Sequence, residues 1–306
     1  MIRTNTVLEL KNLSYIFPDH KGITDVSLKI KQGEIYMLYG GHDAGKTLLL
    51  QMLIGTLIPQ MGTIKLFGNS NYLQEKRRIG YVPQEPYCLG KMSALDMLRY
   101  FALSYGVLEK DFDKVLDLSH VEKKPACHLP LYIQKKINLG IALLGKPDLI
   151  LLDNPFNGLD AQECEHLLSI ISALKEERNM TVLLTGQDYD IASRVVEKYG
   201  ILAGGKLKAE LTPDKINEEC KRCIKIRTPQ VARAITVIQK DFPQYEVLGD
   251  DLIRIFCSSS YSSKINSKLV SSGIEVCEIG ITGMTPKTFL SSLAGGEPLG
   301  ASDYSR

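Results

Sequence analysis

The 306-residue sequence has no run of about 18 uncharged apolar residues, the length that a membrane-spanning helix requires. Its first residues, MIRTNTVLELKNL, also lack the apolar core of a signal peptide. It has no low-complexity segment and no internal repeat, and 44% of its residues are hydrophobic, which excludes a disordered or collagen-like chain. We therefore expect a folded protein that does not itself cross a membrane.

The sequence also lacks an excess of either charge. It carries 37 lysine and arginine residues against 35 aspartate and glutamate residues, a net charge of +2. Neither the part before Lys215 nor the part after it is biased toward one sign. Nothing in the chain has the composition of a polybasic tail, so we expect no nucleic-acid partner.

Paired cysteine motifs are missing as well. Seven cysteines are scattered along the chain, and only Cys220 and Cys223 have the C-x-x-C spacing. Neither a second pair of this kind nor a nearby histidine accompanies them, so the pair is weak evidence for a metal or redox site. Reduced thiols in a cytoplasmic protein are the simplest interpretation.

Strand and helix patterns alternate through the first two thirds of the chain. Residues 7–30 alternate apolar and polar side chains, which predicts short antiparallel strands at a sheet edge. Buried strands are predicted by continuous apolar runs at 34–39, 149–152 and 181–184. We expect a mainly parallel sheet wrapped by helices in a domain spanning residues 1–212, with a helical subdomain at about 85–145.

The composition changes near residues 212–222, and a second pattern follows. Its predicted elements are strand 223–227, helix 231–240, strand 245–248, strand 252–257, helix 262–271 and strand 274–279. This β-α-β-β-α-β order predicts a small ferredoxin-like domain over residues 213–294. A short helix is expected around 286–293, and residues 295–306 are expected to form a flexible tail.

A phosphate-binding loop is predicted directly after the buried strand at 34–39. The segment from Gly40 to Thr47 matches G-x-x-x-x-G-K-[ST], and an apolar helix follows it. In such a loop the backbone N–H groups cradle phosphates, the lysine reaches the terminal phosphates and the hydroxyl binds Mg²⁺. A simple turn between strand and helix would need no Lys-Thr pair after its last glycine. The predicted nucleotide-binding residues of this segment are Gly40, Gly41, His42, Asp43, Ala44, Gly45, Lys46, Thr47 and Leu48.

A carboxylate follows a second buried strand. The run at 149–152 ends in Asp153, which places its carboxylate at the carboxyl end of the strand. In nucleotide-binding sheets this is the place of a carboxylate that holds Mg²⁺. Because a buried carboxylate is costly without a partner, we expect Asp153 to take part in the site.

With these two elements in place, the chain resembles the ATP-binding subunit of ABC transporters over nearly all of residues 7–296. Residues 81–86 (YVPQEP) match the family's glutamine loop, residues 153–160 (DNPFNGLD) match the segment from the magnesium carboxylate to the D-loop, and residues 181–187 match the strand that leads to the switch histidine. The resemblance implies ATP and Mg²⁺ as bound cofactors, with Thr47, Gln84 and Asp153 holding the magnesium. It also implies that Phe17 stacks on the adenine, with Tyr15 as the neighbouring alternative.

The resemblance implies partners and a location too. The end of the chain, residues 285–296, looks like the C-terminal extension of ATP-binding subunits of the bacitracin- and lantibiotic-exporter type. Such a subunit docks on a separate transmembrane permease at the inner face of the cell membrane and dimerises with itself or with a second ATP-binding subunit. The implied fold is an α/β P-loop NTPase domain of the ABC type with antiparallel edge strands and a helical subdomain, followed by a small α+β domain.

Four departures from the family pattern predict slow hydrolysis of ATP. Asn154 stands where the family has the glutamate that polarises the attacking water, and loss of a positioned general base costs about 10²–10⁴-fold in rate. Gln187 replaces the switch histidine and brings no positive charge. The family's LSGGQ segment reads Leu-Pro-Leu-Tyr-Ile at 129–133, and Asp43 replaces a glycine of the phosphate loop. The degenerate catalytic positions are thus Asn154 and Gln187.

Three functional hypotheses remain. The first is an ATP-binding subunit of an exporter, docked on its permease through the glutamine loop and apolar residues such as Tyr87, Leu89, Met92 and Leu95, although simple packing within the domain explains these residues equally well. The second is a regulatory or structural pseudo-ATPase that nucleotide binding switches between conformations. The third, an ABC-type protein that acts on ribosomes or DNA, is weaker because the tandem domains and coiled-coil insertions usual in such proteins are absent.

Overall fold

The computed structural model describes residues 6–107, 124–220 and 223–295. They form two compact units, one that runs to Pro213 and also takes in the segment from Leu290, and one that spans Asp214–Phe289. The boundary between Pro213 and Asp214 lies next to the predicted one at 212–213. The predicted second domain at 213–294 differs at its end, because the residues from Leu290 group with the larger unit. Apart from Gly295, the predicted tail at 295–306 lies outside the described residues. Within the described ranges, no helix is long and apolar enough to cross a membrane.

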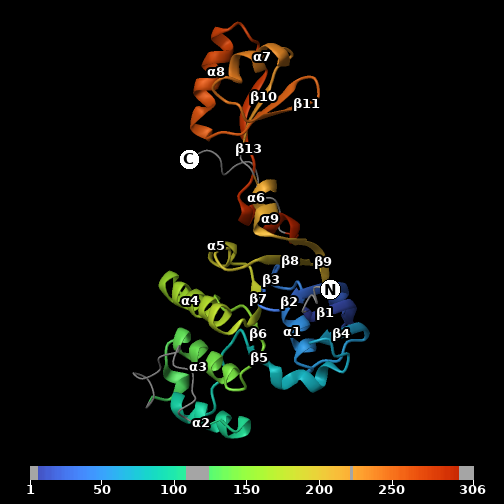
Figure 1. The fold of residues 1–306 in the computed structure, drawn as a ribbon, viewed down its shortest axis with the longest axis vertical. Helices are drawn as coiled ribbons and strands as arrows, with labels where there is room; N and C mark the ends of the chain where they lie inside the picture. The colour runs from blue at the N-terminus through green and yellow to red at the C-terminus, as the bar shows by residue number, and fades with distance from the viewer. Residues whose placement is uncertain (1–5, 108–123, 221–222, 296–306) are drawn as a thin grey trace. The chain divides into compact units, whose positions relative to one another are not determined.

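A six-stranded sheet forms the centre of the larger unit (Figure 1). Its order is β5 (Ile79–Val82), β6 (Leu149–Leu152), β7 (Thr181–Gly186), β3 (Ile35–Tyr39), β8 (Lys198–Ala203) and β9 (Lys206–Leu211). All neighbouring pairs are parallel except β8 with β9. Every residue of β3, β6 and β7 is buried, as the continuous apolar runs indicate. The predicted mainly parallel sheet is confirmed.

A second, antiparallel sheet covers part of the larger unit's core. It has the order β2 (Gly22–Lys31), β1 (Thr6–Ile16) and β4 (Met61–Leu66). Alternate residues of β2 are buried, so one face packs inward and the other meets solvent. The inner face joins one apolar cluster with Tyr36 and Leu38 of β3 and the apolar residues of helix α1 (Lys46–Leu53). The antiparallel strands expected in residues 7–30 are therefore present and buttress the central strand.

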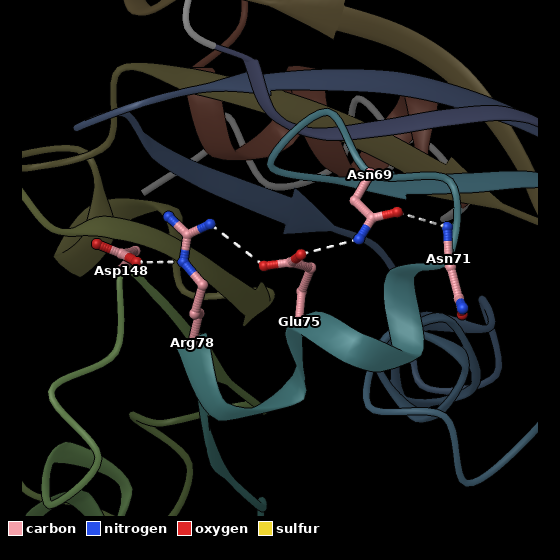
Figure 2. Close-up of polar contacts among 5 residues, drawn as sticks. All are labelled: Asn69, Asn71, Glu75, Arg78 and Asp148. Atoms are coloured by element: carbon pink, nitrogen blue, oxygen red, sulfur yellow. Dashed lines mark hydrogen bonds and ion pairs between the residues drawn. The ribbon is translucent and has the colours of Figure 1, made fainter.

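A short 3-10 helix, η1 (Tyr72–Arg78), is tied to the loop before β6 by a polar network (Figure 2). Arg78 contacts Asp148 with Nε at 2.6 Å and Glu75 with a terminal nitrogen at 3.2 Å. Glu75 in turn accepts a hydrogen bond from Asn69 Nδ2 at 2.9 Å. Arg78 leads directly into β5 and Asp148 into β6, so the network fixes the entry of two neighbouring strands.

The helices of the larger unit flank its sheets. They comprise α1, α2 (Ala94–Tyr105), the 3-10 turn η4 (Ala126–His128), α3 (Leu131–Leu143), α4 (Ala161–Arg178) and the single turn α5 (Tyr189–Ala192). Ser93 caps the start of helix α2 with its hydroxyl, which accepts a hydrogen bond from Asp96 N–H. Gly106 caps the end of the helix in a left-handed conformation. Its buried face packs against Ile137 and Ile141 of α3. Helix α4 starts with a capping box formed by Asp160 and Glu163.

The smaller unit follows the β-α-β-β-α-β order that its sequence predicts. Its elements after α6 (Pro213–Glu219) are β10 (Cys223–Arg227), α7 (Val231–Ile238), β11 (Tyr245–Leu248), β12 (Leu252–Ile255), η5 (Ser259–Tyr261), α8 (Ser262–Ser271) and β13 (Glu278–Thr282). The last helix, α9 (Pro286–Leu293), starts in this unit, and its residues from Leu290 group with the larger one. The four strands form an antiparallel sheet in the order β11-β12-β10-β13. Isoleucines from β10 and β12 pack with those of α7 and α8 into one core.

The last strand of this unit begins later than its sequence pattern predicts. The apolar alternation favours a strand at 274–279, but β13 spans Glu278–Thr282. Ile274 is buried, yet its N–H bonds to Leu269 O, so this residue closes the end of α8 instead of joining the sheet. An apolar residue that packs under a helix end carries the same sequence signal as one that faces inward from a strand.

Candidate functional site

The loop predicted to bind phosphate joins the central strand to a helix. It follows β3, which lies between β7 and β8, and it ends where α1 begins at Lys46. Gly45 has φ +99°, and a Cβ on it would stand 2.5 Å from the Ile23 side chain. A Cβ on Gly40 would stand 2.3 Å from the carbonyl oxygen of Leu202. Only glycine fits these two positions, so the loop can bend tightly against the sheet.

Lys46 is folded over this loop and is buried. Its Nζ donates hydrogen bonds to the carbonyl oxygens of Gly40 and Gly41, each at 2.6 Å. Burial lowers the pKa of the ammonium, and the nearby carboxylates of Asp153 and Asp43 partly oppose this effect. The loop therefore holds the ammonium group of Lys46 at the carboxyl end of β3.

Asp153 stands at the carboxyl end of β6 and is almost fully buried, as its position in the sequence predicts. Its carboxylate accepts a hydrogen bond from Thr185 Oγ1 at 2.7 Å, and its backbone N–H donates to Val82 O at 2.9 Å. Three neighbouring strands, β5, β6 and β7, thus fix this carboxylate. Sequence alone did not single out Thr185, because its contact with Asp153 arises only when the two strands pair.

A cavity of about 240 Å³ lies where these strand ends meet. It is lined by His42, Lys46, Thr47, Gln84, Asp153, Asn154, Asn157, Gly186, Gln187 and Asp188. Seven of these residues are among the predicted site residues, and Asn157, Gly186 and Asp188 are not. Thr47, Gln84 and Asp153 each present an oxygen atom of the kind that Mg²⁺ prefers, so the donor set fits that ion.

The other predicted residues do not line this cavity. Ala44 and Leu48 are buried in the core behind the loop, while Gly41 contributes the carbonyl that Lys46 contacts. Asp43 is exposed and does not line the cavity. Phe17 is 39% exposed and packs edge-on against Tyr15, with ring centroids 5.0 Å apart. The Phe17 ring is therefore accessible to a base.

Asn154 adopts an unusual backbone conformation beside the cavity, with φ +46°. Its backbone N–H donates to Thr185 Oγ1 at 2.9 Å, and its side-chain amide donates to Gln84 Oε1 at 3.3 Å. Asparagine tolerates this left-handed region better than most residues. Asn154 thus connects the end of β6 to the glutamine loop after β5.

A buried lysine that the sequence did not single out supports the turn after Asn154. Lys135 of α3 donates from Nζ to the carbonyl oxygens of Pro155 and Asn157, both at 2.8 Å. Burial lowers its pKa to about 8, and the charge of Asp188 is among the weaker effects that oppose this. Lys135 lies in α3, the helix that starts within the divergent segment at 129–133. An isolated lysine in such a helix predicts only a solvated surface.

The divergent segment itself forms the start of α3. Leu129 is buried, Pro130 is the residue before the helix and gives it no side-chain cap, and Leu131 is partly exposed. A Cβ on Gly158 would stand 2.8 Å from the Leu131 side chain, so this leucine lies close to the turn after β6. The hydroxyl of a capping serine, which would present a donor here, is absent.

Comparisons with known proteins show which families and folds the chain is similar to. The profile of the family described as ABC transporter matches residues 23–157. The chain is 28% identical to the bacitracin transport ATP-binding protein BcrA of Bacillus licheniformis over 97% of this chain and all of that protein. It is 27% identical to the lantibiotic transport ATP-binding protein SrtF of Streptococcus pyogenes over 67% of this chain and 90% of that one.

A solved structure gives the same result for the larger unit. The structure described as the ATP binding subunit of an ABC transporter matches with a TM-score of 0.63 and 27% identity, and it covers 70% of this chain and 92% of that one. The glycine loop, the strand-end carboxylate and these relatives agree. Residues 23–157 match the ABC transporter family, and the chain is similar to ABC transporter ATP-binding proteins.

Proposed function

We propose that the cavity at the ends of β3, β6 and β7 binds Mg-ATP. The observation that carries this proposal is the convergence of Lys46, Thr47 and Asp153 on one cavity at the start of helix α1. Backbone N–H groups of residues 40–46 would surround the phosphates, with Lys46 at the terminal ones. Thr47, Gln84 and Asp153 would hold the magnesium, and Phe17 would stack on the adenine. When bound, the ion neutralises developing charge on the phosphate oxygens.

We infer that this chain hydrolyses ATP slowly. Asn154 occupies the position of the water-activating carboxylate, and its amide cannot take a proton. Gln187 is exposed at the rim of the cavity and brings no charge to the terminal phosphate. The segment 129–133, which would contact the ATP of a dimer partner, carries apolar side chains and a proline without an N–H group.

We further propose that the chain is a peripheral subunit of an exporter, attached to a transmembrane permease at the cytoplasmic face of the membrane. The transport names of the two relatives support a role in transport, and the family supports a dimer with itself or with a second ATP-binding subunit. In a homodimer of this chain, both sites would be degenerate. In a complex with a second ATP-binding subunit, a partner with an intact glutamate and histidine would carry most of the turnover.

An aromatic cavity offers a docking surface for the permease. It has a volume of about 220 Å³, lies beside the glutamine loop and is lined in part by Tyr81, Tyr87, Phe101 and Tyr105. Tyr87 and Tyr105 remain substantially exposed. Leu89 and Met92, by contrast, pack against the helical core of α2 and α3, which favours the alternative of packing within the domain for these two residues.

The second candidate function is a nucleotide-gated regulator without turnover of its own, which the asparagine at 154 favours. Affinity capture of the full chain from its native membranes in mild detergent, with and without Mg-ATP, separates the two functions. Recovery of a stoichiometric transmembrane permease is the expected result. Exchange of Tyr87 and Tyr105 for serine should weaken that recovery, whereas exchange of Tyr261, an exposed tyrosine of the smaller unit, should not. A soluble homodimer without a membrane partner would overturn the exporter proposal in favour of the regulator.

A further inference from the structure

A second carboxylate faces the cavity, next to the position where the family's glutamate is missing. Asp188 follows β7 by two residues and lines the same cavity as Lys46 and Asn154. It is half-buried, so it is neither a core residue nor a fully solvated surface acid. Its position was not predicted from the sequence, because only the pairing of β6 with β7 brings it near Asn154.

The ordinary role of an aspartate at this position is to cap a helix, and Asp188 does not perform it. Although Asp188 precedes α5, its side chain accepts no hydrogen bond from the first turn of that helix. Across the residues that the structure describes, no hydrogen bond or ion pair to its carboxylate is found. A half-buried carboxylate without partners that faces a polar cavity is available for a ligand.

Asp188 and Asn154 face a common space on the two sides of Gly186. A Cβ built on Gly186 would stand 3.4 Å from Asn154 Oδ1 and 3.8 Å from Asp188 Oδ2. Glycine at 186 therefore leaves open the space that these two oxygen atoms border.

We propose that Asp188 is the proton acceptor for ATP hydrolysis in this chain, in place of the carboxylate that residue 154 lacks. This inference rests on the proposed binding of Mg-ATP in the cavity. Asn154 Oδ1 would accept one hydrogen bond from the attacking water and so orient it. As the water oxygen bonds to the γ-phosphorus, the bond from that phosphorus to the bridging oxygen breaks, and its electron pair leaves with ADP. The proton of the water passes to Asp188 and then to solvent.

A structural role for Asp188 is the competing explanation, because its charge also acts on the buried amine of Lys135. A structural partner and a proton acceptor differ in what they change. Loss of a structural charge lowers stability whatever stands at position 154. Loss of a proton acceptor lowers kcat only while no other acceptor is present.

The test measures kcat, KM and Mg-ATP affinity for the full chain and its Asp188→Asn variant, alone and combined with Asn154→Glu. We expect Asp188→Asn to lower kcat by about 10²-fold, the scale of a positioned general base, with unchanged Mg-ATP affinity. In the Asn154→Glu background the same change should leave kcat nearly unaltered. Asp190→Asn, an exposed aspartate outside the cavity lining, is the matched control and should behave as the unmodified chain.

Three results would overturn the inference. One is an unchanged kcat in Asp188→Asn. Another is an equal loss of kcat in both backgrounds together with a lower Tm, which would assign Asp188 a structural role beside Lys135. The last is turnover of the unmodified chain no higher than that of Lys46→Ala. Absence of Mg-ATP binding to the unmodified chain would be a different failure, that of the proposed function itself.

Discussion

The side-chain amide of Asn154 donates a hydrogen bond to Gln84 Oε1 at 3.3 Å and so joins the end of β6 to the loop after β5. A glutamate at 154 would bring a carboxylate against the same oxygen, and the Gln84 amide would have to turn its N–H₂ group toward it. An asparagine holds the two segments together but offers no proton acceptor. The site therefore keeps its architecture while losing the carboxylate expected at position 154.

Restoring the two missing groups should raise ATP turnover. We expect the Asn154→Glu and Gln187→His double variant to increase kcat by about 10²-fold, because a general base and a charged hydrogen-bond donor return to the terminal phosphate. Phosphate release by the assembled complex measures this. Asn154→Ala, which loses the bond to Gln84 without gaining a base, is the control. If the double variant turns over at the original rate, the segment 129–133 or Asp43 limits hydrolysis instead.

Thr185 should matter for magnesium as well as for stability. Its hydroxyl donates to Asp153 and accepts from the backbone N–H of Asn154, so Thr185→Val leaves a buried carboxylate and a half-buried N–H group unsatisfied. We expect a loss of about 1–3 kcal/mol in the free energy of unfolding and a weaker Mg²⁺ dependence of ATP binding.

Thr181→Val provides the matched control for this prediction. Thr181 is also buried on β7, but its hydroxyl accepts from Gly33 N–H at 3.0 Å, away from the cavity. This variant should lose comparable stability and keep its response to magnesium. Identical magnesium titrations for both variants would show that Thr185 does not position Asp153.

Gly45 should tolerate alanine less well than Gly68, although both have positive φ values, +99° and +81°. A Cβ at Gly45 meets Ile23 at 2.5 Å, whereas a Cβ at Gly68 meets no atom within 4 Å. The backbone strain is shared, so the clash makes the difference, about 1–3 kcal/mol. Urea unfolding of the two variants measures it, and equal midpoints would refute the packing argument.

Lys135 should make stability depend on pH. Burial lowers its folded-state pKa from 10.5 to about 8, so the folded chain binds fewer protons than the unfolded chain between these values. The contribution of this residue is fully present above the unfolded pKa and is lost as the pH falls through the folded one. Relative to Lys135→Gln, the unmodified chain should thus gain up to about 3 kcal/mol across this range as the pH rises.

Urea unfolding at a series of pH values across the range measures this gain. Lys136→Gln, on the half-exposed neighbouring lysine, is the control and should show no such gain over the same range. Parallel pH profiles for the unmodified chain and Lys135→Gln would contradict the predicted burial of the charge.

The sequence predicts those features that depend on neighbouring residues. The buried strands and the loop from Gly40 to Thr47 follow from local runs and spacing, and Asp153 follows because it directly ends an apolar run. The prediction of strand 274–279 was wrong because Ile274 packs beneath the end of α8. A single period of apolar residues does not distinguish these two environments.

The rest of the site depends on contacts between distant segments. Thr185 reaches Asp153 across 32 positions of sequence, and Lys135 reaches Asn157 across 22. Asp188 borders the same space as Asn154 only because β6 and β7 lie side by side. Each of these residues reads in the sequence as an ordinary strand, helix or loop residue, so their roles emerge only from the three-dimensional arrangement.

The most direct test of the account is calorimetric titration of the full chain with Mg-ATP, alongside Lys46→Ala and the surface control Lys91→Ala, followed by measurement of turnover on the same samples. The account predicts binding by the unmodified chain and by Lys91→Ala, no binding by Lys46→Ala, and turnover about 10²–10⁴-fold below that of a chain with an intact base. Equal affinity in all three proteins would contradict the phosphate-binding loop. Rapid turnover by the unmodified chain, at the level of the Asn154→Glu and Gln187→His variant, would contradict the impaired site.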